Sequence, residues 1–429
     1  MRRIYSPVLD ENLYIVDLGL GCTLWAMPQL GARQTMAQLQ VGLGALHAFG
    51  GASAVGIAHL IEHLLFQKES GDITDRFAAL GCDINASTGL ECTEFSLCCG
   101  QAFEEPLDLL FELVFDGYMS DVGLQREREI ILSEINLYRD DPEWVAYYGG
   151  LVGAYGDQPI AREIAGDSAL LNAINISELR RWHAAYYRPA NTCLFLSGSF
   201  SIRNLTAICQ KALQRHAPSF TLHEGGHIEP LKPVKVAPAP DRVKTRHLPL
   251  RGPQAHMVFP ARTVGTGLSF IKRELALEIF LDIAIGPTSD AYVALYENGL
   301  IGGDTFSAEV YVQQTYGYCT VGVETPAPDD FVRAVQSILA NAWNECGFSE
   351  DLQRARRKMF GRLVRSFETP EGCLEMMSAS YVLGGHPFEY IEAIDALTLN
   401  DVERAWNECF FDAKPSIVYL LPLTDRDHV

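Results

Sequence analysis

The sequence predicts an α+β protein that consists of two similar halves. Segments with strand and helix patterns alternate along most of its 429 residues. A helix pattern followed by a strand pattern recurs near the C-terminus: Leu399–Arg404 lines up with Ile176–Arg181, and Ser416–Leu420 lines up with Cys193–Ser197 at the same offset. A stretch rich in His, Gly and Pro separates the two copies. We therefore expect domains at residues 1–215 and 254–429, joined by a linker at 216–253.

The first half begins with strands. Apolar and β-branched residues predict strands at 13–18, 22–27 and 36–43, the last with alternating polar and apolar positions. A Gly/Ala loop at 49–56 precedes a helix that contains His59, and another helix is expected at 71–80. Paired strands are expected at 83–86 and 91–98, around a turn at Ser87–Gly89.

Helices dominate the rest of this half. Long helices are predicted at about 102–119 and 122–140, and Asp141-Pro142 ends the second one. A further helix runs from Ser177, the expected N-cap, to Tyr187, and a strand follows at 192–198.

Composition restricts the classes of function. The chain is 48% hydrophobic and 21% charged, which allows large cores and excludes a disordered protein. Its formal net charge of −20 argues against a nucleic-acid partner, since such a protein needs a basic face. The eleven cysteines contain no C-x-x-C pair, which argues against a structural zinc or disulfide framework and favours a reducing compartment.

The N-terminus and the hydropathy pattern suggest where the protein resides. Two basic residues at the start are followed by acidic residues and no apolar run, so we expect no signal or transit peptide. No stretch of 18 or more apolar residues predicts a membrane span. The expected location is cytoplasmic, without a membrane partner.

The most informative motif is His59-Leu60-Ile61-Glu62-His63. On a helix, residues four apart lie one turn apart on one face, so the two imidazoles can hold a divalent metal, most plausibly Zn²⁺. Glu62 can reach the same site without taking a ligand position, which suits a general base for an attacking water. The order H-x-x-E-H is the inverzincin signature.

A second stretch, His223-Glu224-Gly225-Gly226-His227, matches the ordinary zincin order H-E-x-x-H. That order needs a helix, and each of the two adjacent glycines costs about 1 kcal/mol in a helix interior. Because prolines follow closely and no apolar face surrounds the motif, we interpret it as part of the linker.

A third metal ligand should come from elsewhere, since a catalytic zinc has three protein ligands and an open position. Glu127 and Glu134 lie seven residues apart on the predicted helix at 122–140 and share a face. Glu134 lies among Ile131 and Ile135, where a bare carboxylate would be costly, so we expect it to be the ligand. Glu127 could accept a hydrogen bond from a ligand imidazole. For Glu129 we prefer a solvated helix face.

These residues resemble the pitrilysin/insulinase family of zinc peptidases. The resemblance covers nearly the whole chain and includes H-x-x-E-H, Asn85-Ala86 before an extended segment, the Glu127–Glu134 helix and the duplicated halves. It implies halves with mostly antiparallel sheets, one Zn²⁺ on His59, His63 and Glu134, Glu62 as the base, and Glu127 in support. The chain is similar in length to small bacterial members related to mitochondrial processing peptidase, which work as paired subunits.

The resemblance also implies a substrate site. A peptide would add as a strand at a sheet edge that includes Asn85, Ala86, Ser87 and Thr88. The alternative is that Asn85 is only a turn residue.

One departure concerns the Arg and Tyr that complete the sites of this family. In the matching stretch at 295–303, Tyr296 stands at the Arg position and a glycine stands near the Tyr position. A developing oxyanion needs a hydrogen-bond donor. We therefore expect a homologous second subunit to supply the Arg/Tyr pair.

The expected function is zinc-dependent endopeptidase activity on short or unfolded peptides, as the catalytic subunit of a heterodimer. The alternative is a structural subunit of a processing-peptidase-like complex, without catalysis. A zinc hydrolase of other bonds has little support, because the glycines at 42–56 follow no phosphate-binding order.

Overall fold

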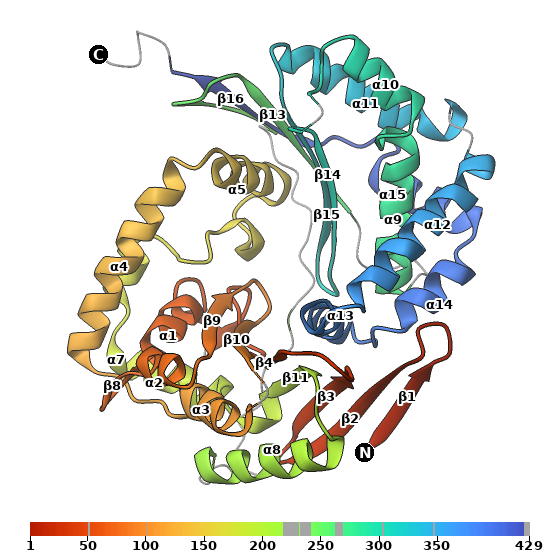
Figure 1. Cartoon of the computed structure of the whole chain (residues 1–429). Coiled ribbons are helices and arrows are strands. Elements are labelled where there is room, and N and C mark those ends of the chain that lie inside the picture. Colours follow the sequence, from red (N-terminus) through yellow and green to blue (C-terminus); the bar gives the residue numbers. More distant parts are fainter. Residues whose placement is uncertain are drawn as a thin grey trace. The chain divides into compact units, whose positions relative to one another are not determined.

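A computed structural model describes residues 1–49, 52–100, 102–217, 231, 242–261, 269–302, 304–345 and 348–423 (Figure 1). The chain forms two compact units. Unit 1 contains residues 1–135, 163–231 and 364–379, and unit 2 contains residues 136–162, 232–363 and 380–429. The predicted α+β class is confirmed, with a sheet and packed helices in each unit.

Unit 1 is built on a seven-stranded sheet. Its strands, in spatial order, are β1 (Arg2–Ser6), β2 (Glu11–Gly19), β3 (Cys22–Pro28), β11 (Thr192–Gly198), β4 (Thr35–Val41), β10 (Thr93–Cys99) and β9 (Asp83–Thr88). All neighbours are antiparallel except β11 and β3. β9 is an edge strand, paired with β10 along one side.

The two faces of this sheet differ because side chains alternate along each strand. On β10, Phe95 and Leu97 are buried in the core, whereas Glu94 belongs to the opposite face, which is partly covered. Leu60 and Ile61 of the metal-motif helix belong to the same hydrophobic core as Phe95. Helices α1 (Ile57–Leu65), α3 (Glu104–Phe115) and α8 (Ile202–His216) pack against the sheet.

Shorter elements complete unit 1. They are β5 (Ala48–Phe49), β6 (Ala52–Ser53), β7 (Gln67–Lys68), β8 (Gly71–Asp72), α2 (Thr74–Ala79), α6 (Ser168–Ala173), α7 (Ile176–Tyr186) and η2 (Pro189–Asn191). Helix α4 (Asp121–Arg139) begins in unit 1 and ends in unit 2.

Unit 2 is built on a five-stranded sheet, in the order β12 (Val243–Leu248), β16 (Ser416–Pro422), β13 (Gln254–Pro260), β15 (Gly317–Glu324) and β14 (Ser307–Val312). Only β12 and β16 are parallel. In unit 1, the five neighbouring strands β3-β11-β4-β10-β9 have the same spatial arrangement as these five strands. Their parallel and antiparallel pairings and their order along the chain correspond one to one. The helix–strand pairs α7–β11 and α15–β16 fall at corresponding places, which agrees with the predicted duplication.

The helices of unit 2 cover both faces of its sheet. α5 (Pro142–Tyr155) packs on β16 and β13, and α9 (Phe270–Ile285) contacts β14. The others are η1 (Pro159–Ala161), α10 (Asp290–Glu297), α11 (Pro328–Glu345), α12 (Phe348–Ser366), α14 (Glu389–Ala396) and α15 (Leu399–Cys409), while α13 (Pro370–Val382) lies mostly in unit 1. α12 ends in unit 1 and α13 begins there.

Helix α5 approaches its sheet closely because it presents glycines to it. A Cβ on Gly150 would lie 2.4 Å from Val258 Cγ2, and a Cβ on Gly153 would lie 1.9 Å from Ser416 Oγ. Both distances are far below normal contact, so neither position has room for a side chain.

Two local predictions were wrong. Ser87 and Thr88 lie within β9, not in a turn, and the connection to β10 spans residues 89–92. The N-cap of α7 is Asn175, whose side chain accepts a hydrogen bond from the Glu178 amide, so the N-cap lies two residues before the expected Ser177. His223–His227 lies outside the described residues. The domain boundaries at 215 and 254 stay a prediction, while unit 2 includes residues 136–162 and unit 1 includes 364–379.

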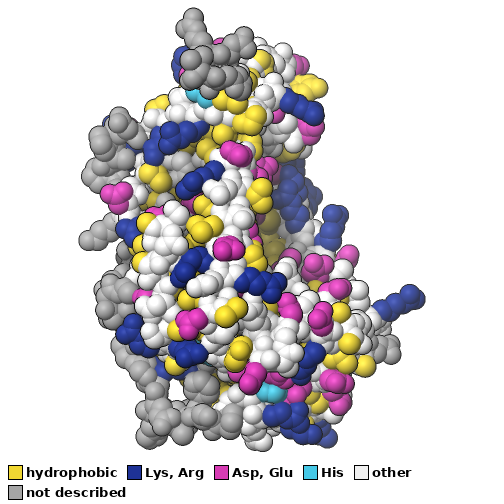
Figure 2. Space-filling model, turned by 90° about the vertical axis from the view of Figure 1, so that its left-hand side faces the viewer, with side chains coloured by type: hydrophobic (Ala, Val, Ile, Leu, Met, Phe, Trp, Pro, Cys, Tyr) yellow, Lys and Arg dark blue, Asp and Glu magenta, His cyan; other side chains and the backbone are white. Residues whose placement is uncertain are grey.

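The face in Figure 2 shows acidic and basic side chains interspersed, without a large basic patch. Among the described helices, none combines the length and apolar character needed to cross a membrane.

We predict that Gly153→Ala lowers the free energy of unfolding by roughly 1–3 kcal/mol, because the new methyl group overlaps Ser416. The matched control is Gly361→Ala on α12, where nothing lies within 4 Å of the added Cβ. That variant should gain stability, by about 0.5–1 kcal/mol. Urea unfolding of both variants gives the comparison, and equal effects would contradict the close packing of α5.

Candidate metal centre

Helix α1 places the two motif histidines on one side and the core residues on the other. It starts after Gly56, whose φ of 77° lies in the left-handed region that favours glycine. Ile57, Leu60, Ile61 and Leu64 are buried in the core of unit 1. His59 and His63 are only partly buried, so they form the accessible side of an otherwise apolar helix.

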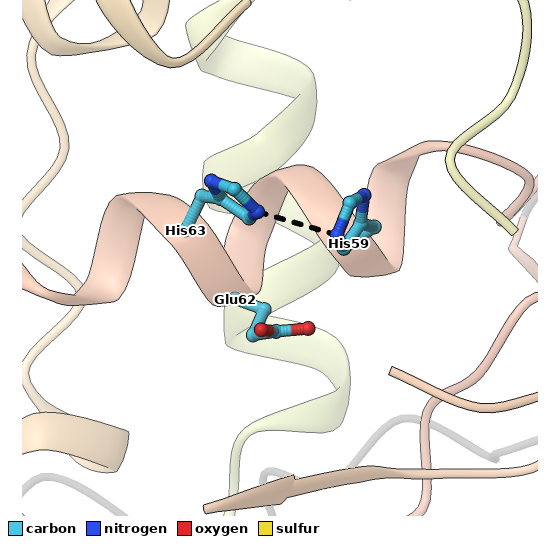
Figure 3. A group of neighbouring side chains, drawn as sticks. All are labelled: His59, Glu62 and His63. Carbon is cyan, nitrogen blue, oxygen red and sulfur yellow. Dashed lines mark hydrogen bonds between the residues drawn. The ribbon is translucent and has the colours of Figure 1, made fainter. Parts of the chain in front are cut away.

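The two imidazoles converge (Figure 3). Their Nε2 atoms lie 3.2 Å apart, and the rings meet edge to face with centroids 4.6 Å apart. Two nitrogens bound to one tetrahedral zinc at about 2.05 Å would be roughly 3.3 Å apart. The pair therefore already has the spacing of two zinc ligands.

Glu134 of α4 supplies a third donor. Its Oε2 atom lies 3.9 Å from His59 Nε2 and 3.8 Å from His63 Nε2. One donor atom of Glu62 also lies within 4.8 Å of the imidazole donors. Glu134 is closer to both imidazoles, so the geometry favours it as the third ligand and leaves Glu62 beside the site. The Glu134 side chain is 29% exposed. It is therefore less buried than we expected from the apolar residues that flank it in the sequence.

Glu127 orients His63. Its Oε2 atom lies 3.2 Å from His63 Nδ1. A carboxylate can only accept, so Nδ1 donates and the lone pair of a neutral imidazole is on Nε2, toward Glu134 and His59. The other oxygen, Oε1, accepts a short hydrogen bond from the Gln67 side-chain amide. The Glu127 side chain is 9% exposed, so it is more deeply buried than that of Glu134.

The protonation of His59 suits a metal, whereas the acidic neighbours of His63 act in the opposite direction on that ring. Burial, with a smaller contribution from His63, lowers the pKa of His59 to about 3, so this ring is neutral at physiological pH. Burial also lowers the pKa of His63, but the hydrogen bond to Glu127 and the charge of Glu134 outweigh it, so the net pKa is raised. His59 Nδ1 is buried and has no hydrogen-bond partner among the described residues.

Glu62 lies on another side of α1 than the two imidazoles (Figure 3), yet one of its oxygens is within 4.8 Å of a nitrogen of each ring. It is 7% exposed, and its Oε2 atom accepts a 2.5 Å hydrogen bond from the Thr88 hydroxyl. Burial raises the pKa of Glu62, and the hydrogen bond from Thr88 and the neighbouring His63 lower it in part. A carboxylate with a raised pKa near a metal position can both take up and return a proton.

The expected substrate strand, β9, lies beside this helix. Asn85 and Ser87 are exposed, whereas Ala86 and Thr88 are partly buried on the side of α1. The Asn85 side chain accepts a hydrogen bond from the Ala86 amide, 3.0 Å away. β9 thus offers a backbone edge, with alternate side chains directed to solvent.

Sequence reasoning missed two contacts. Gln67 was not singled out, and the helical period could not indicate it, because it lies on β7 beyond the end of α1. The Thr88 side chain was expected to bind substrate, yet it contacts Glu62. Tyr296, the residue at the expected Arg position, lies on α10 and is 58% exposed.

Family profiles match both parts of the chain. The profile described as Insulinase (Peptidase family M16) matches residues 27–168, and that described as Peptidase M16 inactive domain matches residues 173–359. The chain belongs to the pitrilysin/insulinase family. His59, Glu62, His63, Glu127 and Glu134 all lie within the insulinase match.

Related proteins agree with this family membership along nearly the whole chain. YmfH from Bacillus subtilis, described as an uncharacterized zinc protease, is 26% identical over 417 residues, covering 95% of this chain and 96% of YmfH. The structure of an M16-like peptidase from Alicyclobacillus acidocaldarius has a TM-score of 0.87 and 25% identity, covering 98% of this chain and 100% of that one. A Pseudomonas fluorescens M16 inactive-domain structure, 17% identical with a TM-score of 0.81, covers 96% and 98% and shares the fold.

We predict that Glu127→Gln weakens zinc binding by on the order of 10- to 100-fold, because the amide supports His63 less well than a carboxylate. The control is Glu129→Gln, an exposed residue on the same helix, which should leave the affinity unchanged. Competition with a chromophoric chelator measures the dissociation constants. Equal affinities for the two variants would exclude the role of Glu127.

Proposed function

We propose that the chain is a zinc-dependent endopeptidase that hydrolyses short or unfolded peptides. The observation that supports this most is the convergence of His59, His63 and Glu134 beside Glu62. These three residues would hold the metal, and the zinc protease description of YmfH supports zinc as its identity. Bound there, zinc would act as a Lewis acid and lower the pKa of a water.

The residues of the chain perform the other parts of the reaction. Glu62 accepts the proton of the attacking water and then delivers it to the nitrogen of the leaving amine. The Thr88 hydroxyl occupies Oε2, so Oε1 is the oxygen available for this proton. Glu127 keeps the Nε2 lone pair of His63 directed to the ligand position throughout.

The substrate class follows from the strand edge. A peptide that pairs with β9 along Asn85–Thr88 must present its own backbone amides and carbonyls. Folded proteins have these groups already paired, so the proposed substrates are short or unfolded. The exposed side chains on β9 are small or polar, which places few demands on the sequence of the peptide.

We also propose a homologous second subunit that supplies an Arg/Tyr pair. Tyr296 is at the position where the resemblance expects the Arg, and it cannot provide a cationic donor. The structural match to the periplasmic protease PqqL from Escherichia coli covers 96% of this chain but 48% of PqqL, so that chain is about twice as long. A pair of chains like this one would have a similar total length.

The alternative is a structural subunit without catalysis. The inactive-domain profile supports it only over residues 173–359, whereas all five metal-site residues lie outside that range. The endopeptidase proposal therefore accounts for more of the site.

The ten described cysteines without disulfides support the cytoplasmic location that we propose.

We expect Glu62→Gln to retain one zinc per chain and to lose turnover of an unstructured peptide by several orders of magnitude, since the amide cannot accept the proton. Zinc is measured by elemental analysis, and hydrolysis by mass spectrometry of the peptide fragments. Parental turnover in this variant would disprove the role of Glu62. A wild-type chain that binds no zinc after careful purification would favour the structural subunit.

The second subunit is tested by reconstitution. We expect the purified chain alone to cleave slowly, and a co-expressed homologue that contains the Arg/Tyr pair to raise the rate. A homologue in which that Arg is replaced by Ala is the control, and it should associate without raising the rate. Full turnover by the chain alone would rule out this requirement.

A further inference from the structure

The Glu62 carboxylate has one hydrogen-bond donor in the described part of the chain, the hydroxyl of Thr88. The distance from Thr88 Oγ1 to Glu62 Oε2 is 2.5 Å, at the short end of the range for a hydroxyl that donates to an ionised oxygen. Glu62 is almost fully buried, so water does not replace such a contact easily. The rotamer of Glu62 therefore depends on the position of this one hydroxyl.

Thr88 is itself held in place. It is β-branched and lies at the end of β9, opposite Thr93 of β10. The two hydroxyl oxygens are 3.4 Å apart, and Thr93 donates to the Leu43 carbonyl oxygen at 2.9 Å. A hydroxyl has one hydrogen, so the hydrogen of Thr93 is used by Leu43, while the hydrogen of Thr88 is free for Glu62. The fully buried Thr93 thus fixes the side from which Thr88 reaches the carboxylate.

We propose that Thr88 is a positioning residue for Glu62. By holding Oε2, its hydroxyl keeps Oε1 in the orientation that removes a proton from the attacking water. This inference rests on the proposed function, since it assumes that Glu62 is the base. It changes the role expected for Thr88 from a contact with the peptide to a contact with the base.

The location of Thr88 adds a second consequence. Thr88 and Asn85 belong to the same edge strand, whose backbone is proposed to bind the peptide. One rigid element would therefore set both the position of the peptide backbone and the orientation of the base. A shift of β9 would move both together, so their relative placement would be preserved.

A purely structural role makes different predictions. If Thr88 only satisfied a buried carboxylate, its loss would reduce stability or zinc content and leave the turnover of the folded protein unchanged. If Thr88 contacted the peptide, its loss would raise KM. A positioning role lowers kcat with KM and zinc content unchanged.

The test compares Thr88→Val, which removes the hydroxyl at nearly constant shape, with Thr88→Ser, which keeps it. The matched control is Thr192→Val, which removes another buried hydroxyl of the same sheet, one that donates to the Pro189 carbonyl oxygen. All variants are assayed as the full chain, under the conditions in which the parent cleaves the peptide. We expect Thr88→Val to lower kcat by on the order of 10- to 100-fold, and Thr88→Ser and Thr192→Val to stay within about 2-fold of the parent.

A crystal structure of Thr88→Val provides a readout independent of activity. We expect the Glu62 carboxylate to occupy more than one rotamer in this variant. A single unchanged rotamer, an unchanged kcat, or equal impairment of Thr88→Ser and Thr88→Val would overturn the inference. An inactive but zinc-loaded parent would refute the proposed function instead, and the rotamer of Glu62 would still test its dependence on Thr88.

Discussion

The structure of the site depends on one constraint. Candidate ligand atoms from two helices that are far apart in the sequence must lie within 4 Å of one another, although no polar core surrounds them. α1 meets this constraint by placing its apolar residues in the core and leaving His59 and His63 at the margin. α4 contributes carboxylates at two turns' separation, so that one reaches the imidazole lone pairs and the other the far side of His63. The helical period thus places both carboxylates on the site side of α4, each against different atoms of the imidazoles.

Burial and charge are balanced in this arrangement. Burial keeps His59 neutral, while both oxygens of the buried Glu127 accept hydrogen bonds, one from His63 and one from Gln67. The site therefore consists of a chain of contacts from Gln67 through Glu127 and His63 to His59. Such a chain keeps these side chains oriented, which would reduce the entropy lost on binding the metal that we propose.

Much of this could be predicted from the sequence. The strand at 192–198 and the helices around His59 and Glu127 were predictable because their apolar periods are regular. Glu127 and Glu134 were predictable because a seven-residue spacing on a helix defines a face. The extension of β9 through Ser87 and Thr88 was not, because Ser, Thr and Gly together suggest a turn and cross-strand pairing with Thr93 overrides that preference. The Thr88–Glu62 contact depends on that register, so it too could not be predicted from the sequence.

The duplicated sheets end in corresponding edge strands, β9 in unit 1 and β14 in unit 2. An unpaired edge can recruit a strand from any neighbouring molecule, which makes such edges a risk for aggregation. Here the exposed positions include Asp83 on β9 and Glu309 on β14, and the whole chain is strongly acidic. Repulsion between like charges would oppose the stacking of identical chains edge to edge, while a passing peptide of different composition would not meet that barrier. The acidity of the protein would then protect an edge that, under the proposed function, stays open for a peptide.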